Sequence, residues 1–148
     1  MDEIKIVKGG ISVDERGSIS HANGFDMNDI KRFYVIHQND TSAIRAWHGH
    51  QFEKKYFFAV KGSFTIAFVK IDSWENPSDS LQPSVFTLSD TKSEIICLPE
   101  GFASGIKANK PDSILMVFSN KALSEAADDS WRYDKDLWID WSKMNRND

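Results

Sequence analysis

The chain has 148 residues, 41% hydrophobic and 27% charged, which predicts one globular domain spanning residues 1–148 with a single core. Eighteen basic and 22 acidic residues give a net charge of −4 without a strongly basic stretch, which argues against nucleic acid as the main partner. No apolar run approaches the roughly 18 residues of a membrane helix, and the first residues lack the segments of a signal peptide, so we expect a cytoplasmic protein.

Short apolar segments separated by Pro, Gly, Asn, Asp and Ser predict strands along most of the chain. They cover residues 4–7, 32–36, 56–60, 64–71, 85–88, 94–98, 102–106 and 113–118. The glycine-containing turn between the third and fourth of these segments predicts a hairpin. A polar loop follows at 72–83, and 121–128 is the best helix candidate. The pattern is typical of an all-β sandwich, jelly roll or barrel with one short C-terminal helix.

Residues 45–50, Arg-Ala-Trp-His-Gly-His, are the most informative segment. His48 and His50 are two residues apart, so a strand would place both imidazoles on one face. A regular strand would place Arg45 on the opposite face, and it joins the histidines only if a bulge or twist intervenes. The alternative interpretation is a surface strand whose histidines are exposed by chance.

A pair of histidines two residues apart on a strand is also a common metal-ligand pattern. It resembles the first cupin motif, but Glu53 lies closer to His50 than that motif requires, and lysine stands at the expected glutamate position. The second motif, Pro-x-Gly-x-x-His, occurs at 99–104 with Ser104 in place of the ligand histidine. We therefore expect no metal and no other cofactor.

The same residues suit proton transfer next to a ketone, which needs a base with a pKa near neutral and positive groups around the developing enolate. His48 is the candidate base. His50, Lys55 and Arg45 are candidates for balancing the negative charge or holding a phosphate.

Four segments, in order, resemble the cupin-fold sugar-nucleotide isomerases, the group around dTDP-4-dehydrorhamnose 3,5-epimerase and the dTDP-4-keto-6-deoxyhexose 3,4-ketoisomerases. Asp-Glu-Arg-Gly at 14–17 and Pro-Glu-Gly-Phe-Ala-Ser-Gly at 99–105 are similar to epimerase motifs. Residues 32–64 carry three motifs similar to the ketoisomerase pattern: Arg-Phe-Tyr-Val-Ile, the histidine segment and Val-Lys-Gly-Ser-Phe. The tryptophan-containing tail at 131–141 resembles the epimerase C-terminal motif.

The resemblance implies a cupin-type double-stranded jelly roll (RmlC-like), a homodimer, and metal-free chemistry on a dTDP-sugar. His48 stands at the family's general base and His50 at the second histidine of the ketoisomerase pattern. Tyr34 matches a tyrosine of that pattern, which makes it a third catalytic candidate. Substrate binding is implied for three further residues, namely Arg16, Arg45 and Lys55. The tryptophans of the tail are expected to pack it against the sheets.

Two departures from the epimerase pattern bear on the reaction. Ser104 stands where the epimerases have their later histidine, and Met116 lies near the position of their proton-donating tyrosine. The resulting hypothesis is an epimerase-like isomerase acting on a dTDP-linked 4-keto-6-deoxyhexose. The alternatives are a 3,4-ketoisomerase on the same substrate class and a non-catalytic nucleotide-sugar-binding cupin. Arg16 has a further interpretation, a simple salt bridge with Asp14 in a turn.

Overall fold

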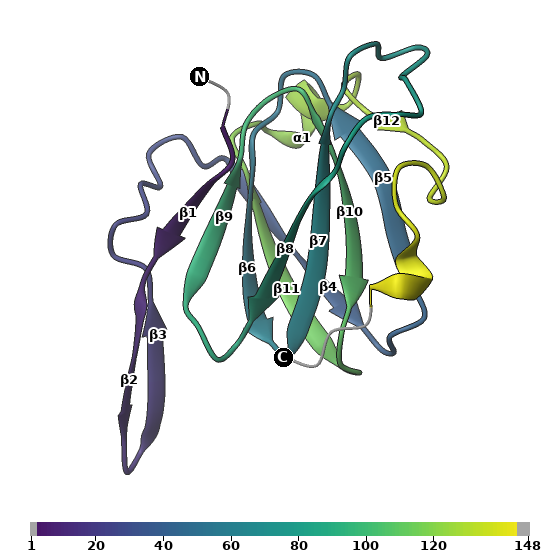
Figure 1. The fold of residues 1–148 in the computed structure, drawn as a ribbon. Helices are drawn as coiled ribbons and strands as arrows, with labels where there is room; N and C mark the ends of the chain where they lie inside the picture. Colours follow the sequence, from purple (N-terminus) through teal and green to yellow (C-terminus); the bar gives the residue numbers. More distant parts are fainter. Residues whose placement is uncertain (1–2, 145–148) are drawn as a thin grey trace.

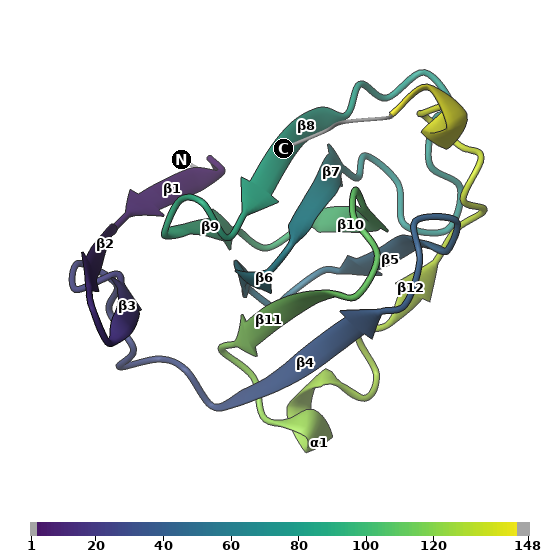
Figure 2. The ribbon, with the colours of Figure 1, turned by 90° about the horizontal axis from the view of Figure 1, so that it is seen from below.

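Two five-stranded antiparallel sheets face each other in the computed structural model, which describes residues 3–144 (Figure 1, Figure 2). The predicted domain ends, residues 1–2 and 145–148, lie outside this range. The first sheet has the order β1 (Lys5–Lys8), β9 (Glu94–Leu98), β6 (Lys55–Lys61), β11 (Ser113–Ser119) and β4 (Arg32–Gln38). The second has the order β12 (Trp131–Arg132), β5 (Ile44–His50), β10 (Phe102–Ala108), β7 (Ser63–Lys70) and β8 (Ser84–Ser89).

Three smaller elements complete the structure. The strands β2 (Gly10–Asp14) and β3 (Gly17–His21) form a hairpin that projects away from the two sheets (Figure 1). A helix, α1 (Leu123–Ala126), lies within the predicted 121–128 segment but is shorter than predicted. A single 3-10 turn, η1 (Trp141–Lys143), ends the described chain. The all-β prediction with one short helix near the C-terminus is therefore confirmed.

Alternating side chains build the core between the sheets. In β11, Leu115 and Val117 are fully buried, whereas Met116 and Phe118, which alternate with them, are half-buried on the outer face. From the second sheet, Phe64, Ile66 and Phe68 of β7 complete the same core. Because side chains alternate along a strand, one face of each sheet supplies this core and the other face needs separate cover.

The C-terminal tail covers the outer face of the second sheet. Trp47 of β5 packs against Trp138 and Trp141, with ring centroids 5.2 and 5.6 Å apart. Its indole Nε1 donates to the Leu137 carbonyl at 3.0 Å. This cover explains why β7 is buried on both faces, and the predicted packing of the tail tryptophans is confirmed.

The predicted hairpin between the segments 56–60 and 64–71 is wrong. The two strands belong to different sheets, because β6 pairs with β9 and β11 whereas β7 pairs with β10 and β8. Gly62, with φ of 78°, turns the chain from one sheet to the other. A side chain at this glycine would collide with Ser113. A short glycine turn serves a sheet-crossing corner as well as a hairpin, and distant strands decide which one forms.

Candidate active site

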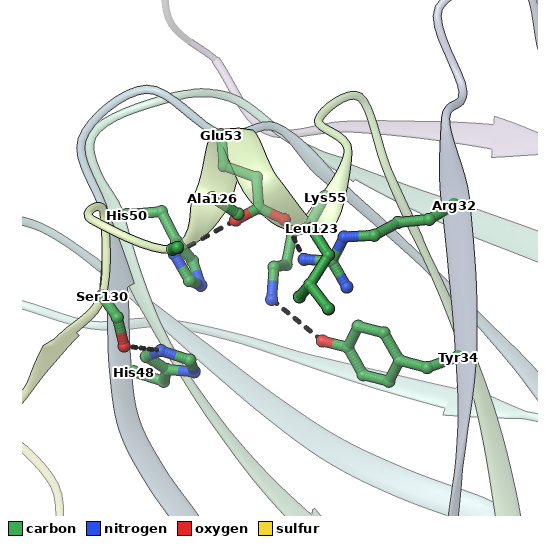
Figure 3. A pocket seen from close by; sticks show the side chains of 10 residues that line it. Arg32, Tyr34, His48, His50, Glu53, Lys55, Leu123, Ala126 and Ser130 are labelled. Carbon is green, nitrogen blue, oxygen red and sulfur yellow. Dashed lines mark hydrogen bonds and ion pairs between the residues drawn. The ribbon is translucent and has the colours of Figure 1, made fainter.

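Two adjoining cavities, of about 380 and 480 Å³, open between the sheets. The first lies where β5 ends and β6 begins, and the second extends along β5 to Ile44. Both are lined by Tyr34, His48 and Lys55. The first sheet supplies Tyr34 from β4 and Lys55 from β6, and the second supplies the histidines from β5. Ala126 of α1 contributes to the rim of the first cavity (Figure 3).

The two histidines form one wall of the site (Figure 3). Their ring centroids lie 4.3 Å apart, as expected for two residues on one face of a strand. His48 Nε2 is 2.7 Å from the Ser130 hydroxyl. His50 Nδ1 is 2.7 Å from the backbone carbonyl of Asp129. Because a carbonyl oxygen only accepts, Nδ1 of His50 carries the hydrogen, and the lone pair of the neutral ring lies on Nε2.

Tyr34 and Lys55 form the facing wall (Figure 3). The Lys55 ammonium donates to the Tyr34 hydroxyl oxygen at 2.9 Å and lies 5.2 Å from the centre of its ring. Since the ammonium occupies an acceptor position of the phenol, the phenolic hydrogen remains available to a ligand. Lys55 is only 5% exposed, so its charge acts in a poorly solvated space.

Glu53, whose side chain is fully buried, lines the first cavity between His50 and Arg32 (Figure 3). Its Oε2 accepts from Arg32 Nη2 at 2.9 Å and from the Ser119 hydroxyl. Its Oε1 lies 3.2 Å from His50 Nδ1. The sequence presents this glutamate only as a misplaced metal ligand, because nothing in its spacing indicates Arg32 as a partner.

A bulge in β5 brings Arg45 into the site. Ser104 of β10 is opposite His48 and Ile106 is opposite Arg45, so three steps along β5 match two along β10. The extra residue changes the alternation, and Arg45 and His48 line the same cavity. The bulge that Arg45 needs to share a face with His48 is therefore present. The Nε of Arg45 also donates to Gln38 Oε1 at 2.6 Å.

Arg132 is a cavity residue that sequence reasoning missed. It lies on β12 directly opposite His48 and lines the second cavity. The sequence predicts only a packing role for the tail, because its motif does not indicate that β12 pairs with β5. Ser104 lines the same cavity from β10.

Arg16 lies apart from the other predicted site residues. It is at the turn of the projecting hairpin, where its Nη2 pairs with Asp14 Oδ2 at 2.6 Å, and it lines neither cavity. Its predicted contact with substrate stays a prediction. Met116 faces outward from β11, opposite Val35 and Phe58, so the position compared with the epimerase tyrosine does not face the cavities.

Burial keeps both imidazoles of the site in the neutral form. Burial, followed by the positive charges of His50, Lys55 and Arg132, lowers the pKa of His48 to about 3. Burial also lowers the pKa of His50, as does the charge of Lys55, while Glu53 acts in the opposite direction. Both rings are therefore available as proton acceptors at neutral pH.

The depressed pKa of His48 makes folding stability depend on pH. Between the folded pKa of about 3 and the ordinary value of 6.5, the unfolded chain binds a proton at this position and the folded protein does not. The contribution of His48 to the free energy of unfolding is therefore fully present above pH 6.5 and is lost as the pH falls towards 3. In thermal melts, we expect His48→Gln to lose less Tm than the wild type between about pH 7 and about pH 4. Equal losses would contradict the assignment.

The donor set is a poor one for a cation. Among residues 3–144, no group of three or more His, Cys, Asp or Glu side chains is arranged to hold a metal ion. The histidine pair faces the Lys55 ammonium, and Ser104 occupies the position of the cupin ligand histidine. A buried cation beside the histidines disfavours a second one.

The double antiparallel sheet, with a cavity at one end lined from both sheets, is a cupin-type jelly roll. Residues 2–136 match the family model described as "FdtA: WxcM-like, C-terminal", and the chain belongs to this family. A search of curated proteins gives no significant match. Within residues 3–144, no helix has the length and apolar character to cross a membrane.

Solved structures with the same fold include both kinds of enzyme expected from the sequence. The RmlC epimerase of Mycobacterium tuberculosis aligns with TM-score 0.74 and 21% identity, over 93% of this chain and 74% of that one. The sugar 3,4-ketoisomerase QdtA of Thermoanaerobacterium thermosaccharolyticum, in complex with TDP, aligns with TM-score 0.68 and 19% identity over 88% of both chains. The RmlC 3,5-epimerase of Legionella pneumophila, in complex with dTDP-4-keto-L-rhamnose, aligns with TM-score 0.76 and 18% identity, over 95% and 79%. The RmlC-like fold prediction is confirmed.

Proposed function

We propose that the protein is a metal-independent isomerase that acts on a dTDP-linked 4-keto-6-deoxyhexose. The observation that carries the proposal is the pair of facing walls, with imidazoles on one side and the Tyr34 hydroxyl and Lys55 ammonium on the other. A ketone acidifies the neighbouring C–H, and this arrangement offers a base and hydrogen-bond donors around one sugar-sized space. Structural relatives crystallised with TDP or dTDP-4-keto-L-rhamnose support the substrate class.

The reaction begins when an imidazole removes the proton next to the ketone. His50 is the better placed of the two, because its Nε2 is buried without a hydrogen-bond partner in the described chain. His48 Nε2, in contrast, is engaged by Ser130. The electron pair of the C–H bond moves to the ketone oxygen, and the resulting enolate is balanced by Arg45 and Lys55.

Return of the proton decides the product. In the epimerase reaction, a group on the opposite wall delivers a proton to the other face of the same carbon, and Tyr34 is placed for this role. The Lys55 ammonium, which already donates to the Tyr34 oxygen at 2.9 Å, then returns a proton to this oxygen. We therefore favour epimerisation.

The second candidate is a 3,4-ketoisomerase, in which the proton taken from C3 returns to C4, the hydroxyl proton passes from the C3 oxygen to the C4 oxygen, and the ketone moves to C3. The observation that favours it is the 4.3 Å separation of the two imidazoles on one wall, which suits transfer of a proton along one face of the sugar. Both reactions share the first step and differ in whether Tyr34 is needed.

Product analysis separates these functions. The protein is incubated with dTDP-4-keto-6-deoxyglucose, and the sugar is followed by proton NMR. An inverted centre at C3 or C5 with the ketone still at C4 identifies an epimerase, and a 3-keto sugar identifies a ketoisomerase. Tight binding of the nucleotide sugar with no new product would overturn the catalytic proposal and leave a binding module.

Arg132 is expected to hold the negatively charged part of the substrate. It and Arg45 line the second cavity, which adjoins the histidine wall. We expect Arg132→Gln to raise the KM for the nucleotide sugar by about tenfold, the effect of losing one charged hydrogen bond, with little change in kcat. Steady-state kinetics measure both parameters. A fall in kcat at constant KM would instead place Arg132 in the chemical step.

A homodimer would cover the outer face of the first sheet. Met116 lies between Val35 and Phe58 across three strands of this face, and Phe118 lies between Phe33 and Tyr56. Phe33 and Val35 are 60% and 52% exposed. Exposed apolar side chains gathered on one sheet face suit an interface, and a second copy offers a matching face.

Charge placed on this face should therefore separate the subunits. We expect the wild type to sediment as a dimer and Phe33→Asp to shift the protein towards monomer. Leu123→Asp, which alters an exposed apolar residue of α1 outside this face, is the control and should remain dimeric. A monomeric wild type would contradict the proposed assembly.

A further inference from the structure

We infer that Glu53 is a positioning residue that provides the charge balance required of His50 as the base. The inference rests on the proposed function, because it assigns a supporting partner to the residue proposed to take the proton. It is carried by geometry around a single nitrogen, Nδ1 of His50. That atom donates to the Asp129 carbonyl at 2.7 Å and lies 3.2 Å from Glu53 Oε1.

Glu53 is held rigidly at this place. Its carboxylate is fully buried, and the guanidinium of Arg32 and the hydroxyl of Ser119 both bind the other oxygen, Oε2. Oε1 has no hydrogen-bond partner in the described chain and is left facing the imidazole. A buried carboxylate oxygen is costly without compensation, and an imidazolium beside it supplies that compensation.

The loop that carries Glu53 is fixed by a second acidic residue. The Asp129 carboxylate accepts from the backbone N–H groups of Gln51 and Phe52 at 2.7 and 2.9 Å. Because those bonds use the Asp129 carboxylate, only its carbonyl reaches His50, and Glu53 is the carboxylate nearest the ring nitrogen. Asp129 thus fixes the loop and adds a smaller effect of the same sign, while Glu53 is the carboxylate with the larger effect on the pKa of His50.

The consequence for catalysis is a difference between the two states of His50. When the ring is neutral, Nδ1–H is held and Nε2 keeps its lone pair towards the cavity. When Nε2 takes the substrate proton, the new positive charge lies between Glu53 and the opposing charge of Lys55. The other titratable groups near the ring are His48 and the Asp129 carboxylate, whose charge also raises the pKa of His50. Glu53 stabilises the imidazolium and so strengthens the base.

The test is Glu53→Gln, which keeps the shape and removes the charge. We expect kcat to fall by on the order of 10²-fold with KM nearly unchanged, since a neighbouring carboxylate that supports a base acts in the chemical step. The pKa of His50, followed by NMR of its ring in the unliganded protein, should fall, because Glu53 raises it in the wild type. The acid limb of the pH–rate profile should move to lower pH in parallel.

The control is Glu125→Gln, which removes an exposed carboxylate paired with Lys31 and should change neither kcat nor the pKa of His50. If Glu53→Gln does not fold, Glu53→Asp is used instead. It keeps a charge for Arg32 but withdraws it from the imidazole, so the pKa of His50 must fall here as well. An unchanged His50 titration in a folded variant overturns the inference. Absence of isomerase activity in the wild type overturns the proposed function instead, and leaves the titration result standing.

Discussion

Replacement of His50 by asparagine is expected to lower kcat for the isomerisation by on the order of 10²–10⁴-fold, the contribution of a positioned general base. The amide fills much of the space of the ring but cannot take up the substrate proton. Arg132, which we propose to hold the negatively charged part of the substrate, is untouched, so the affinity for dTDP should be unchanged. Steady-state kinetics and a dTDP titration by calorimetry measure the two quantities.

Two further variants make this result specific. His37 lies on the outer face of β4, where it is exposed and pairs with Asp112, so His37→Asn should behave as the wild type. His48→Asn should reduce the rate less than His50→Asn, since the Nε2 of His48 is already engaged by Ser130. The reverse order of effects would assign the base to His48, as the family resemblance implies.

Replacement of Arg32 by methionine is expected to destabilise the fold by about 3–5 kcal/mol. Glu53 is fully buried, and Arg32 is its charged partner at 2.9 Å. Removal of the guanidinium leaves a carboxylate without its counter-charge in a space that excludes water. Urea unfolding monitored by tryptophan fluorescence measures the loss.

The partner substitution separates lost packing from an unpaired charge. In the double variant Arg32→Met with Glu53→Leu, no charge is left buried, and most of the stability should return. Lys31→Met removes a neighbouring but exposed pair with Glu125 and should cost less than about 1 kcal/mol. A double variant no more stable than Arg32→Met alone would show that the loss comes from packing around Arg32.

The strands could be predicted from the sequence because side-chain alternation is a local property. Each predicted segment from 32–36 onwards falls in a strand of the structure. The pairing of those strands could not be predicted in the same way. The turn at Gly62 has the local pattern of a hairpin, yet β6 and β7 find partners far along the chain and lie in opposite sheets.

The residues of the site show the same difference between local spacing and contacts of distant segments. His48 and His50 share a face because they are two residues apart on one strand, and the need for a bulge at Arg45 followed from the same alternation. Tyr34 and Lys55 come together because β4 and β6 both pair with β11. The roles of Arg32, Glu53 and Arg132 depend on contacts between distant segments, which no local spacing records.

Removal of a proton next to a ketone by the imidazole wall is measured by solvent exchange. The wild-type protein and His50→Asn are each incubated with dTDP-4-keto-6-deoxyglucose in D2O, and loss of the sugar proton signals is followed by NMR. We expect deuterium at a carbon next to the ketone with the wild type, and a strongly reduced rate with the variant. Nucleotide sugar that stays bound to the wild type without any exchange would contradict proton removal by this wall.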